Sequence, residues 1–231
     1  MRNLVFLPGF MLTAALWDDM RGDLATLGNL QFGDLGRDGS LDAMADRILQ
    51  EVPGKFILFG FSMGGFVAQA IALKAPERVL GLGLLNTSSR PQSAQESAAT
   101  LAQLALAERT PFKGLTSRAL ASALHPARAT DPALLQRLQA MAVDNGKEVF
   151  LRQLSTLRDG SHADLDRIDC PTLIVASDAD RLRTVEESEE MAKRIPAAHF
   201  EIVRDCGHMT PMEQPQVLFQ IIADWLAQSG L

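Results

Sequence analysis

Apolar residues gather into short continuous runs, separated by longer stretches in which apolar positions lie three and four residues apart. Runs without polar alternation are typical of strands covered on both faces, as in a parallel sheet. The wider spacing indicates amphipathic helices. The runs, of which only the last alternates, predict strands at residues 4–7, 30–35, 56–59, 79–85, 171–176 and 199–203. The stretches between them predict helices at residues 14–27, 41–51, 66–73, 185–195 and 213–227.

The order of these elements, strand and helix in turn, indicates the class of fold. Such alternation is typical of a doubly wound α/β protein with a mostly parallel sheet and right-handed crossovers. Residue types at the boundaries agree, because Thr13 and Ser40 can cap the first two helices and Pro76 ends the third. A length of 231 residues suits one domain, or one domain that carries an insertion.

The alternation stops between residues 90 and 164, where no strand-like run occurs. Four helical patterns, separated by proline or Asn-Gly pairs, occupy this segment instead. They cover residues 94–109, 115–124, 133–144 and 147–158. We therefore expect an α/β core made of residues 1–89 and 165–231, with residues 90–164 inserted as a helical cap. This cap is interpreted as a lid that shapes a substrate pocket, because binding segments lie at the carboxyl ends of strands. Extra packing helices are the alternative.

The strand predicted at residues 56–59 leads into a glycine-rich turn and then into a helical run. In the turn, Gly60, Ser62 and Gly64 form the pattern G-x-S-x-G, in the strand-turn-helix context of a nucleophile elbow. Glycine is needed at both flanking positions, because a side chain there would collide with the packed strand and helix. The helix that follows directs unpaired N–H groups toward the Ser62 hydroxyl and would stabilise negative charge there. The alternative is a serine in an ordinary turn.

With this motif and two later loops, the chain resembles the α/β-hydrolase fold superfamily, as a capped serine hydrolase of the carboxylesterase and enol-lactonase branch. In that family the nucleophile, the acid and the histidine of the catalytic triad follow in this order. The matching positions are Ser62 in GFSMGG, Asp180 in LIVASDADRLRT and His208 in DCGHMTPMEQP. The resemblance implies that His208 activates Ser62, and that Asp180 orients the imidazole and stabilises its cation.

The resemblance also implies an oxyanion hole made of two backbone N–H groups. One belongs to Met63, which follows the nucleophile, and the other to Phe10, which follows the first strand. Many family members carry His-Gly after that strand, whereas this chain has Pro8-Gly9. Met11 is therefore an alternative to Phe10 as the second donor.

Other titratable residues compete for the roles of base and acid. His125 and His162 fall in the insertion and could line a pocket, whereas His199 lies in a strand-like run and is interpreted as structural. Asp178 competes with Asp180, because the glycine that usually opens the acid loop in the family is absent here.

Composition and charge narrow the range of partners. The apolar fraction is 47% and the charged fraction 22%, which is ordinary for a globular protein. With a net charge of −6 and no long basic run, neither nucleic acid nor a membrane surface is expected as a partner. A small ester-like molecule is the expected partner, and the oligomeric state is left open.

Cysteine usage and the first residues bear on cofactors and location. No cysteine or histidine cluster has metal-ligand spacing and no cofactor motif occurs, so neither a metal nor a cofactor is expected. Cys170 and Cys206 are interpreted as free thiols, and Cys206 as a small buried hydrophobe. The first apolar run is too short for a signal peptide or a membrane span, which predicts a cytoplasmic location.

A serine nucleophile with a base and an oxyanion hole performs acyl transfer, and water as the second acceptor makes the enzyme a hydrolase. We expect a serine esterase that cleaves carboxylic esters, thioesters or lactones of small to medium acyl groups through an acyl-enzyme. A ligand receptor with little turnover is one alternative. A lyase or carbon–carbon bond hydrolase on the same triad, similar to the menaquinone-pathway synthase, is another and would need cationic groups. Residues 90–164 offer Arg90, Arg118, Arg128, Arg152 and Arg158.

Overall fold

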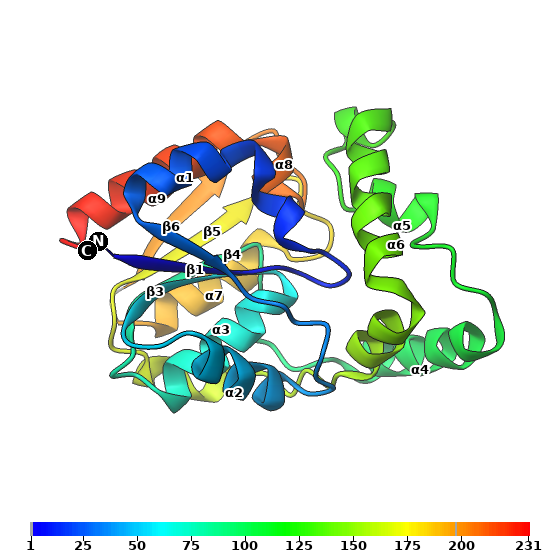
Figure 1. The fold of residues 1–231 in the computed structure, drawn as a ribbon, viewed down its shortest axis with the longest axis horizontal. Coiled ribbons are helices and arrows are strands. Elements are labelled where there is room, and N and C mark those ends of the chain that lie inside the picture. The colour runs from blue at the N-terminus through cyan, green and yellow to red at the C-terminus, as the bar shows by residue number, and fades with distance from the viewer. Residues whose placement is uncertain (1, 197) are drawn as a thin grey trace.

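The computed structural model describes residues 2–196 and 198–231. Within them, six strands form one sheet in the order β2-β1-β3-β4-β5-β6, and every neighbouring pair is parallel (Figure 1). The strands are β1 (Asn3–Leu7), β2 (Asn29–Phe32), β3 (Phe56–Phe61), β4 (Val79–Leu85), β5 (Thr172–Ser177) and β6 (Ala198–Val203). Parallel pairing requires crossover connections, and helices supply them here.

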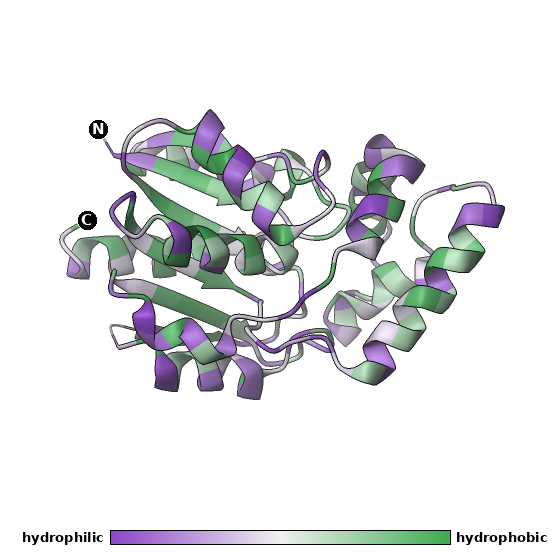
Figure 2. Ribbon diagram, turned by 90° about the horizontal axis from the view of Figure 1, so that it is seen from below, coloured by the Kyte–Doolittle hydropathy of each residue, from purple (hydrophilic) through white to green (hydrophobic). Residues whose placement is uncertain are grey.

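Helices cover both faces of the sheet, as Figure 1 shows. One face buries a cluster that includes Trp17 and Trp225, and the other buries a cluster that includes Val67 and Ile71. Figure 2 shows the strands as the most continuously hydrophobic part of the chain. The first face carries η1 (Ala14–Met20), α1 (Arg21–Leu27) and α9 (Pro215–Gln228), and the second carries α2 (Leu41–Glu51), α3 (Met63–Lys74) and α7 (Val185–Arg194). This arrangement confirms the predicted doubly wound parallel α/β sheet.

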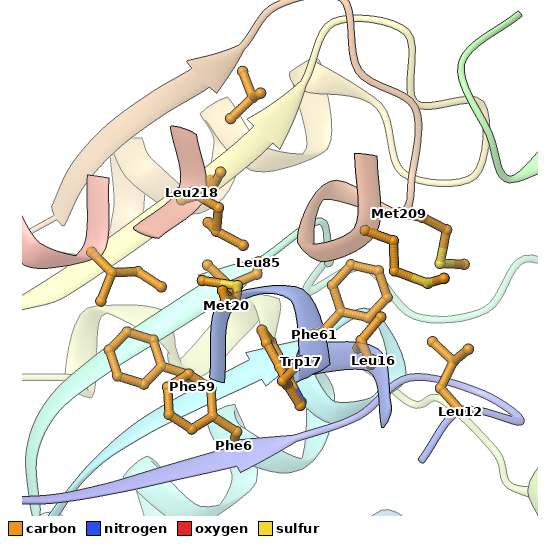
Figure 3. Packing of buried hydrophobic residues seen from close by; sticks show 14 of the residues in the cluster. Phe6, Leu12, Leu16, Trp17, Met20, Phe59, Phe61, Leu85, Met209 and Leu218 are labelled. Carbon is orange, nitrogen blue, oxygen red and sulfur yellow. The ribbon is translucent and has the colours of Figure 1, made fainter. Parts of the chain in front are cut away.

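Aromatic side chains fix the end of β3, from which the serine turn begins (Figure 3). The rings of Phe6 and Phe59 stack with centroids 4.8 Å apart, and Trp17 meets Phe6 at 4.9 Å. Phe61 is fully buried and lies edge-on to Trp17. Because burying a ring of this size contributes about 2–3 kcal/mol, the residue before Ser62 has little freedom to move.

Some elements begin and end where the apolar pattern predicts, among them α2 and β4. The helix predicted at residues 14–27 is divided, because Met20, at φ −124°, leaves the helical region between η1 and α1. The helix predicted from residue 213 instead begins at Pro215, after a single turn, α8 (Thr210–Glu213). A proline at the first helical position favours such a restart, since its missing N–H has no partner there.

Only helices are described between β4 and β5, and Figure 1 shows α4, α5 and α6 beside the carboxyl ends of the strands. The break predicted between the helical patterns at residues 133–144 and 147–158 is confirmed, because two helices meet at a kink there. Gly146, at φ 74° and ψ −179°, bends the run between them. None of the described helices combines the length and apolar content that a membrane crossing requires. The elements of this segment are α4 (Ala94–Arg109), α5 (Ser117–Ser122), η2 (Pro126–Arg128), α6 (Pro132–Ser155) and η3 (His162–Arg167).

Between β3 and α3 the chain turns sharply at Ser62, which has φ 50° and ψ −113°. Residues with a side chain rarely adopt this conformation, and it costs about 1–3 kcal/mol. Three hydrogen bonds stabilise it: Ser62 N–H donates to Leu85 O at 2.9 Å, and Ser62 O accepts from Thr87 Oγ1 at 2.7 Å and from Gly65 N–H at 3.0 Å. The neighbouring strand β4 and the loop after it thus hold the serine in place.

The glycines on either side of this turn allow a close approach of backbones. A Cβ atom on Gly64 would lie 2.5 Å from the carbonyl oxygen of Pro8, at the end of β1. A Cβ atom on Gly60 would overlap the carbonyl oxygen of Gly64 and lie 2.7 Å from Cβ of Ala68. Neither contact is possible without moving the backbone, as the sequence pattern predicts.

Replacing Gly64 by alanine is therefore expected to lower the free energy of unfolding by about 3 kcal/mol, because β1 and α3 must separate to admit the methyl group. Gly22 in α1 provides the matched control, since a Cβ atom there would meet nothing within 4 Å. Gly22→Ala is expected to raise stability by about 0.5–1 kcal/mol through the higher helix propensity of alanine. Urea unfolding measures both, and equal effects of the two substitutions would contradict the close packing of the turn.

Candidate active site

The structure brings three side chains from distant parts of the chain into one hydrogen-bonded row. Ser62 follows β3, Asp180 lies beyond β5, and His208 lies beyond β6. Ser62 Oγ is 2.9 Å from His208 Nε2, and His208 Nδ1 is 2.7 Å from Asp180 Oδ2. An ionised carboxylate can only accept hydrogen bonds, so Nδ1 carries a hydrogen atom and donates a hydrogen bond to Asp180. The unprotonated Nε2 then faces the Ser62 hydroxyl as an acceptor.

The surroundings of Asp180 favour its ionised form. Its Oδ1 accepts the backbone N–H groups of Leu182 at 2.8 Å and Arg183 at 2.9 Å. Burial alone would raise the pKa of this carboxyl, but the charge and hydrogen bond of His208, together with the two N–H groups, outweigh it. The pKa of Asp180 therefore lies below its ordinary value, and the group remains a hydrogen-bond acceptor for His208 at neutral pH.

A buried polar network behind Asp180 was not found from the sequence. Asn86 Nδ2 donates to Asp180 Oδ2 at 3.1 Å and to Ser177 Oγ at 2.9 Å. Thr210 Oγ1 donates to Asn86 Oδ1 at 2.6 Å. Asn86 directly follows a predicted strand, so its position at the carboxyl edge of the sheet was a usable signal. The pairing with Thr210 has no signature in the sequence, because it joins residues 124 positions apart.

The competing histidines and aspartate make other hydrogen bonds. The Asp178 carboxylate accepts backbone N–H groups of the loop after β6 and so orders that loop. His199 bonds Glu201, His162 bonds Ser89, and Nδ1 of His125 accepts the N–H of Ala127. In the part of the chain that the structure describes, no three His, Cys, Asp or Glu side chains are grouped so that they could hold a metal ion.

The two residues whose N–H groups are expected to bind an oxyanion lie at the same cavity as Ser62. Phe10 and Met63 both line a cavity that also contains Ser62 and His208. The N–H of Met11, the alternative donor, instead bonds Oε1 of Gln153 at 2.8 Å. Gln153 is buried in α6, 142 positions from Met11, and no local pattern indicates this contact. The N–H of Phe10 has no such acceptor among the described residues, which favours Phe10 over Met11 as the donor.

Two cavities of different character meet at Ser62. One, of about 210 Å³, is apolar and lies under α5 and α6, with Leu115, Leu120, Leu138 and Met209 in its wall. The other, of about 280 Å³, is named the polar cavity here because its wall includes the charged side chains of Glu96, Arg158 and Arg183. A molecule bound with its reacting carbon at Ser62 could extend into both.

Cys206 lies two residues before His208 but faces the polar network, with Sγ 3.6 Å from Thr210 Oγ1. It is fully buried. Burial raises the pKa of its thiol to about 11, although the hydrogen bond with Thr210 partly opposes the increase. This agrees with its interpretation as a small buried side chain.

Glu213 was also missed by the sequence reasoning, although it lies in the quoted segment DCGHMTPMEQP. Its side chain has 0% exposure. Its Oε1 accepts the N–H groups of Gly207 at 3.1 Å and Met209 at 3.2 Å, on either side of His208, and its Oε2 accepts the N–H of His125 at 2.7 Å. Glu213 thus ties the histidine loop to the end of α5.

We expect Glu213→Gln to lower the free energy of unfolding by about 3 kcal/mol, because an amide cannot accept all three buried N–H groups. Glu77→Gln, at an exposed position, is the matched control and should change stability by less than about 0.5 kcal/mol. Thermal unfolding measures the loss, and hydrogen exchange should show faster exchange at the Gly207, Met209 and His125 amides. Exchange that is unchanged at these amides would contradict the role of Glu213.

The raised pKa of Cys206 predicts slow alkylation of the folded protein, since the thiolate is the reactive form. At pH 8, a pKa of about 11 leaves on the order of one thiol in a thousand ionised. Mass spectrometry after treatment with iodoacetamide should show Cys206 unmodified in the folded protein and modified in urea. Rapid modification under native conditions would show that the thiol is neither buried nor protonated.

Comparison with known proteins identifies the family. The sequence model of the Alpha/beta hydrolase family matches residues 4–221. Pimeloyl-[acyl-carrier protein] methyl ester esterase of Klebsiella pneumoniae is 41% identical over 88 residues, 35% of this chain and 34% of that protein. The chain thus spans about a third of the length of this relative. The protein of the same name from Nitrosomonas europaea is 27% identical over 241 residues, 93% of this chain and 91% of that protein.

Solved structures agree with the sequence comparison. A thermophilic esterase from Thermogutta terrifontis superposes with a TM-score of 0.87 at 28% identity, covering 99% of this chain and 90% of that one. The match to the family model extends over nearly the whole sheet and its helices. The chain therefore belongs to the Alpha/beta hydrolase family.

Proposed function

We propose that the protein is a carboxylic ester hydrolase in which Ser62 is the nucleophile, His208 the general base and acid, and Asp180 the residue that orients His208. The observation that carries this proposal is the continuous row of hydrogen bonds, 2.9 Å from serine to imidazole and 2.7 Å from imidazole to carboxylate. The row ends in a serine whose backbone conformation directs its hydroxyl toward two cavities. Relatives named as esterases add support at the level of reaction class.

In the first half of the proposed reaction, the Ser62 oxygen attacks the carbonyl carbon while His208 Nε2 takes the hydroxyl proton. The carbonyl oxygen becomes an oxyanion, to which the N–H groups of Phe10 and Met63 donate hydrogen bonds. Asp180 stabilises the imidazolium that forms. His208 then gives the proton to the leaving alcohol oxygen as the ester C–O bond breaks, and the acyl group remains on Ser62.

In the second half, a water molecule attacks the acyl carbon and His208 accepts its proton. The second oxyanion uses the same two N–H groups, and its collapse returns the proton to Ser62 and releases the carboxylic acid. Thioesters and lactones present the same carbonyl geometry, so the mechanism applies to them without a change of residues.

The apolar cavity supports small or medium substituents as substrates. Its volume of about 210 Å³ is modest, and the side chains in its wall are mostly aliphatic. Leu120 and Leu138 come from α5 and α6, and Leu115 comes from the segment that leads into α5. We therefore infer that residues 90–164 form a cap over the core of residues 1–89 and 165–231, and that this cap shapes the substrate pocket.

Ser62→Ala is expected to lower kcat for p-nitrophenyl butyrate by at least about 10³-fold, because the nucleophile is removed while the cavities remain. Ser117→Ala, at an exposed position of α5, is the matched control and should leave the rate unchanged. Release of p-nitrophenolate measures both, and a fluorophosphonate probe should label the Ser62 peptide alone. Equal rates for wild type and Ser62→Ala, or a label on another residue, would refute the proposal.

A further inference from the structure

The polar cavity beside Ser62 contains two arginines that the proposed reaction does not use. Arg158 and Arg183 line it together with Ser62 and Met63. The same two arginines line an adjoining hollow of about 260 Å³ that leads away from the serine. A group bound between the two hollows would contact both guanidinium groups while its other end reached Ser62.

Arg158 lacks a counter-ion, although other partly buried arginines of this protein have one. Arg90 makes two hydrogen bonds with Glu190, and Arg47 makes two with Asp38. Within residues 2–196 and 198–231, the Arg158 side chain makes neither a salt bridge nor a hydrogen bond, although it is half-buried. Burial and the neighbouring charge of Arg183 lower its pKa, but a guanidinium stays charged at neutral pH. A partly desolvated cation without a partner favours binding of an anion.

Arg183 is held beside it by the acid loop. Its backbone N–H bonds Asp180, and its guanidinium carbon lies 5.6 Å from the centre of the Phe66 ring. The nearest carboxylate oxygen, Oε1 of Glu187, is 3.9 Å from Nη1, which is longer than a hydrogen bond. The planar donor group of Arg183 therefore keeps most of its hydrogen-bonding capacity for a ligand.

The two carboxylates near these arginines already stabilise helix ends. Glu96 Oε2 accepts the N–H of Ser93 at the start of α4, and Glu187 Oε2 accepts the N–H of Thr184 at the start of α7, both at 2.8 Å. The hydrogen bond with Ser93 lowers the pKa of Glu96, so this acid is ionised. One carboxylate, Glu96, therefore faces two guanidinium groups in the cavity at Ser62, and the net charge of these three groups is positive.

The apolar cavity lacks such charged side chains, because His208 is its only titratable residue among those described. The site is thus apolar on the side of α5 and α6 and cationic on the side of Arg158. Such asymmetry selects molecules that are themselves asymmetric about the reacting carbonyl.

On the basis of the proposed ester hydrolysis, we propose that Arg158 and Arg183 form an anion-binding subsite, and that the substrate carries a carboxylate or phosphate on one side of the ester and an apolar group on the other. Guanidinium groups bind two oxygens of either anion in a planar fork. The subsite would fix the direction in which an ester lies across Ser62.

The test compares kcat/KM within two matched pairs of substrates. Methyl hexanoate and monomethyl adipate differ by a carboxylate on the acyl part, and 1-butyrylglycerol and 1-butyrylglycerol 3-phosphate differ by a phosphate on the alcohol part. In the wild type, the anionic member of at least one pair should be the better substrate. Arg158→Gln and Arg183→Gln should each lower the ratio of anionic to neutral kcat/KM about tenfold. The pair whose ratio falls in these variants identifies the bound anion as a carboxylate or a phosphate.

Arg109→Gln, at an exposed position at the end of α4, is the matched control and should leave every ratio unchanged. Arg158→Lys keeps the charge without the planar fork, and should restore part of the ratio lost in Arg158→Gln. A ratio that is the same in wild type and Arg158→Gln for both pairs would overturn the subsite. If Ser62-dependent hydrolysis of the neutral esters persisted in that case, the proposed function would still stand.

If the wild type hydrolysed none of the four esters, the proposed function would fail and binding would decide the subsite separately. Calorimetric titration of the wild type with adipate and with inorganic phosphate then measures the anion site directly. Binding of either anion that is lost in Arg158→Gln and kept in Arg109→Gln supports the subsite. Absence of binding to the wild type, or equal binding to all three proteins, overturns it.

Discussion

Ser62 occupies a backbone conformation, φ 50° and ψ −113°, that an isolated chain avoids. The surrounding sheet makes this conformation possible. Its N–H and its carbonyl oxygen are both bonded to β4 and the loop after it, and Gly64 admits the end of β1 against the start of α3. The serine hydroxyl can therefore leave the turn at an angle that neither a regular strand nor a regular helix would allow. The position of every other group at the site is defined relative to this hydroxyl.

The loops at the carboxyl edge of the sheet are organised by buried polar side chains more than by regular structure. Asn86 donates to Asp180 and accepts a hydrogen bond from Thr210, and Glu213 accepts the N–H groups that flank His208. Several N–H groups of these loops have a side-chain acceptor in place of a backbone carbonyl. A buried N–H without an acceptor costs about 1–3 kcal/mol. Side chains that accept these groups therefore stabilise the loops and set their geometry at once.

The strands, and the edge of the sheet at which the three side chains meet, could be predicted from the sequence for a physical reason, and the family resemblance selected Asp180 and His208 there. Parallel strands covered on both faces form long apolar runs, and the residues just beyond them must lie at one edge of the sheet. Ser62, Asp180 and His208 all occupy such positions. Strand β4 and helix α2 were likewise predicted to the residue, because the apolar run of the strand stops at Asn86 and Ser40 caps the helix.

What the sequence did not reveal depends on contacts between distant segments. Periodicity gives the buried face of residues 14–27 but does not distinguish a 3₁₀ turn from an α-helix, so the break at Met20 was missed. By contrast, the break predicted at the Asn-Gly pair before residue 147 is present, because Gly146 leaves the helical region between two helices. The acceptors Gln153 and Glu213 act on residues that local patterns cannot connect with them, since the bond from Met11 to Gln153 spans 142 positions.

The bond between Met11 and Gln153 has a consequence for how this family could diversify. Gln153 in α6 holds the loop that carries Phe10, and Ala123 at the end of α5 accepts the N–H of His208 at 2.8 Å. The helices between β4 and β5 are thus hydrogen-bonded to the loop that carries Phe10 and to the loop that carries His208. Grafting these helices from another protein would succeed only if the transplant brought its own acceptors for those two amides. These helices and the two loops they bond therefore have to change together.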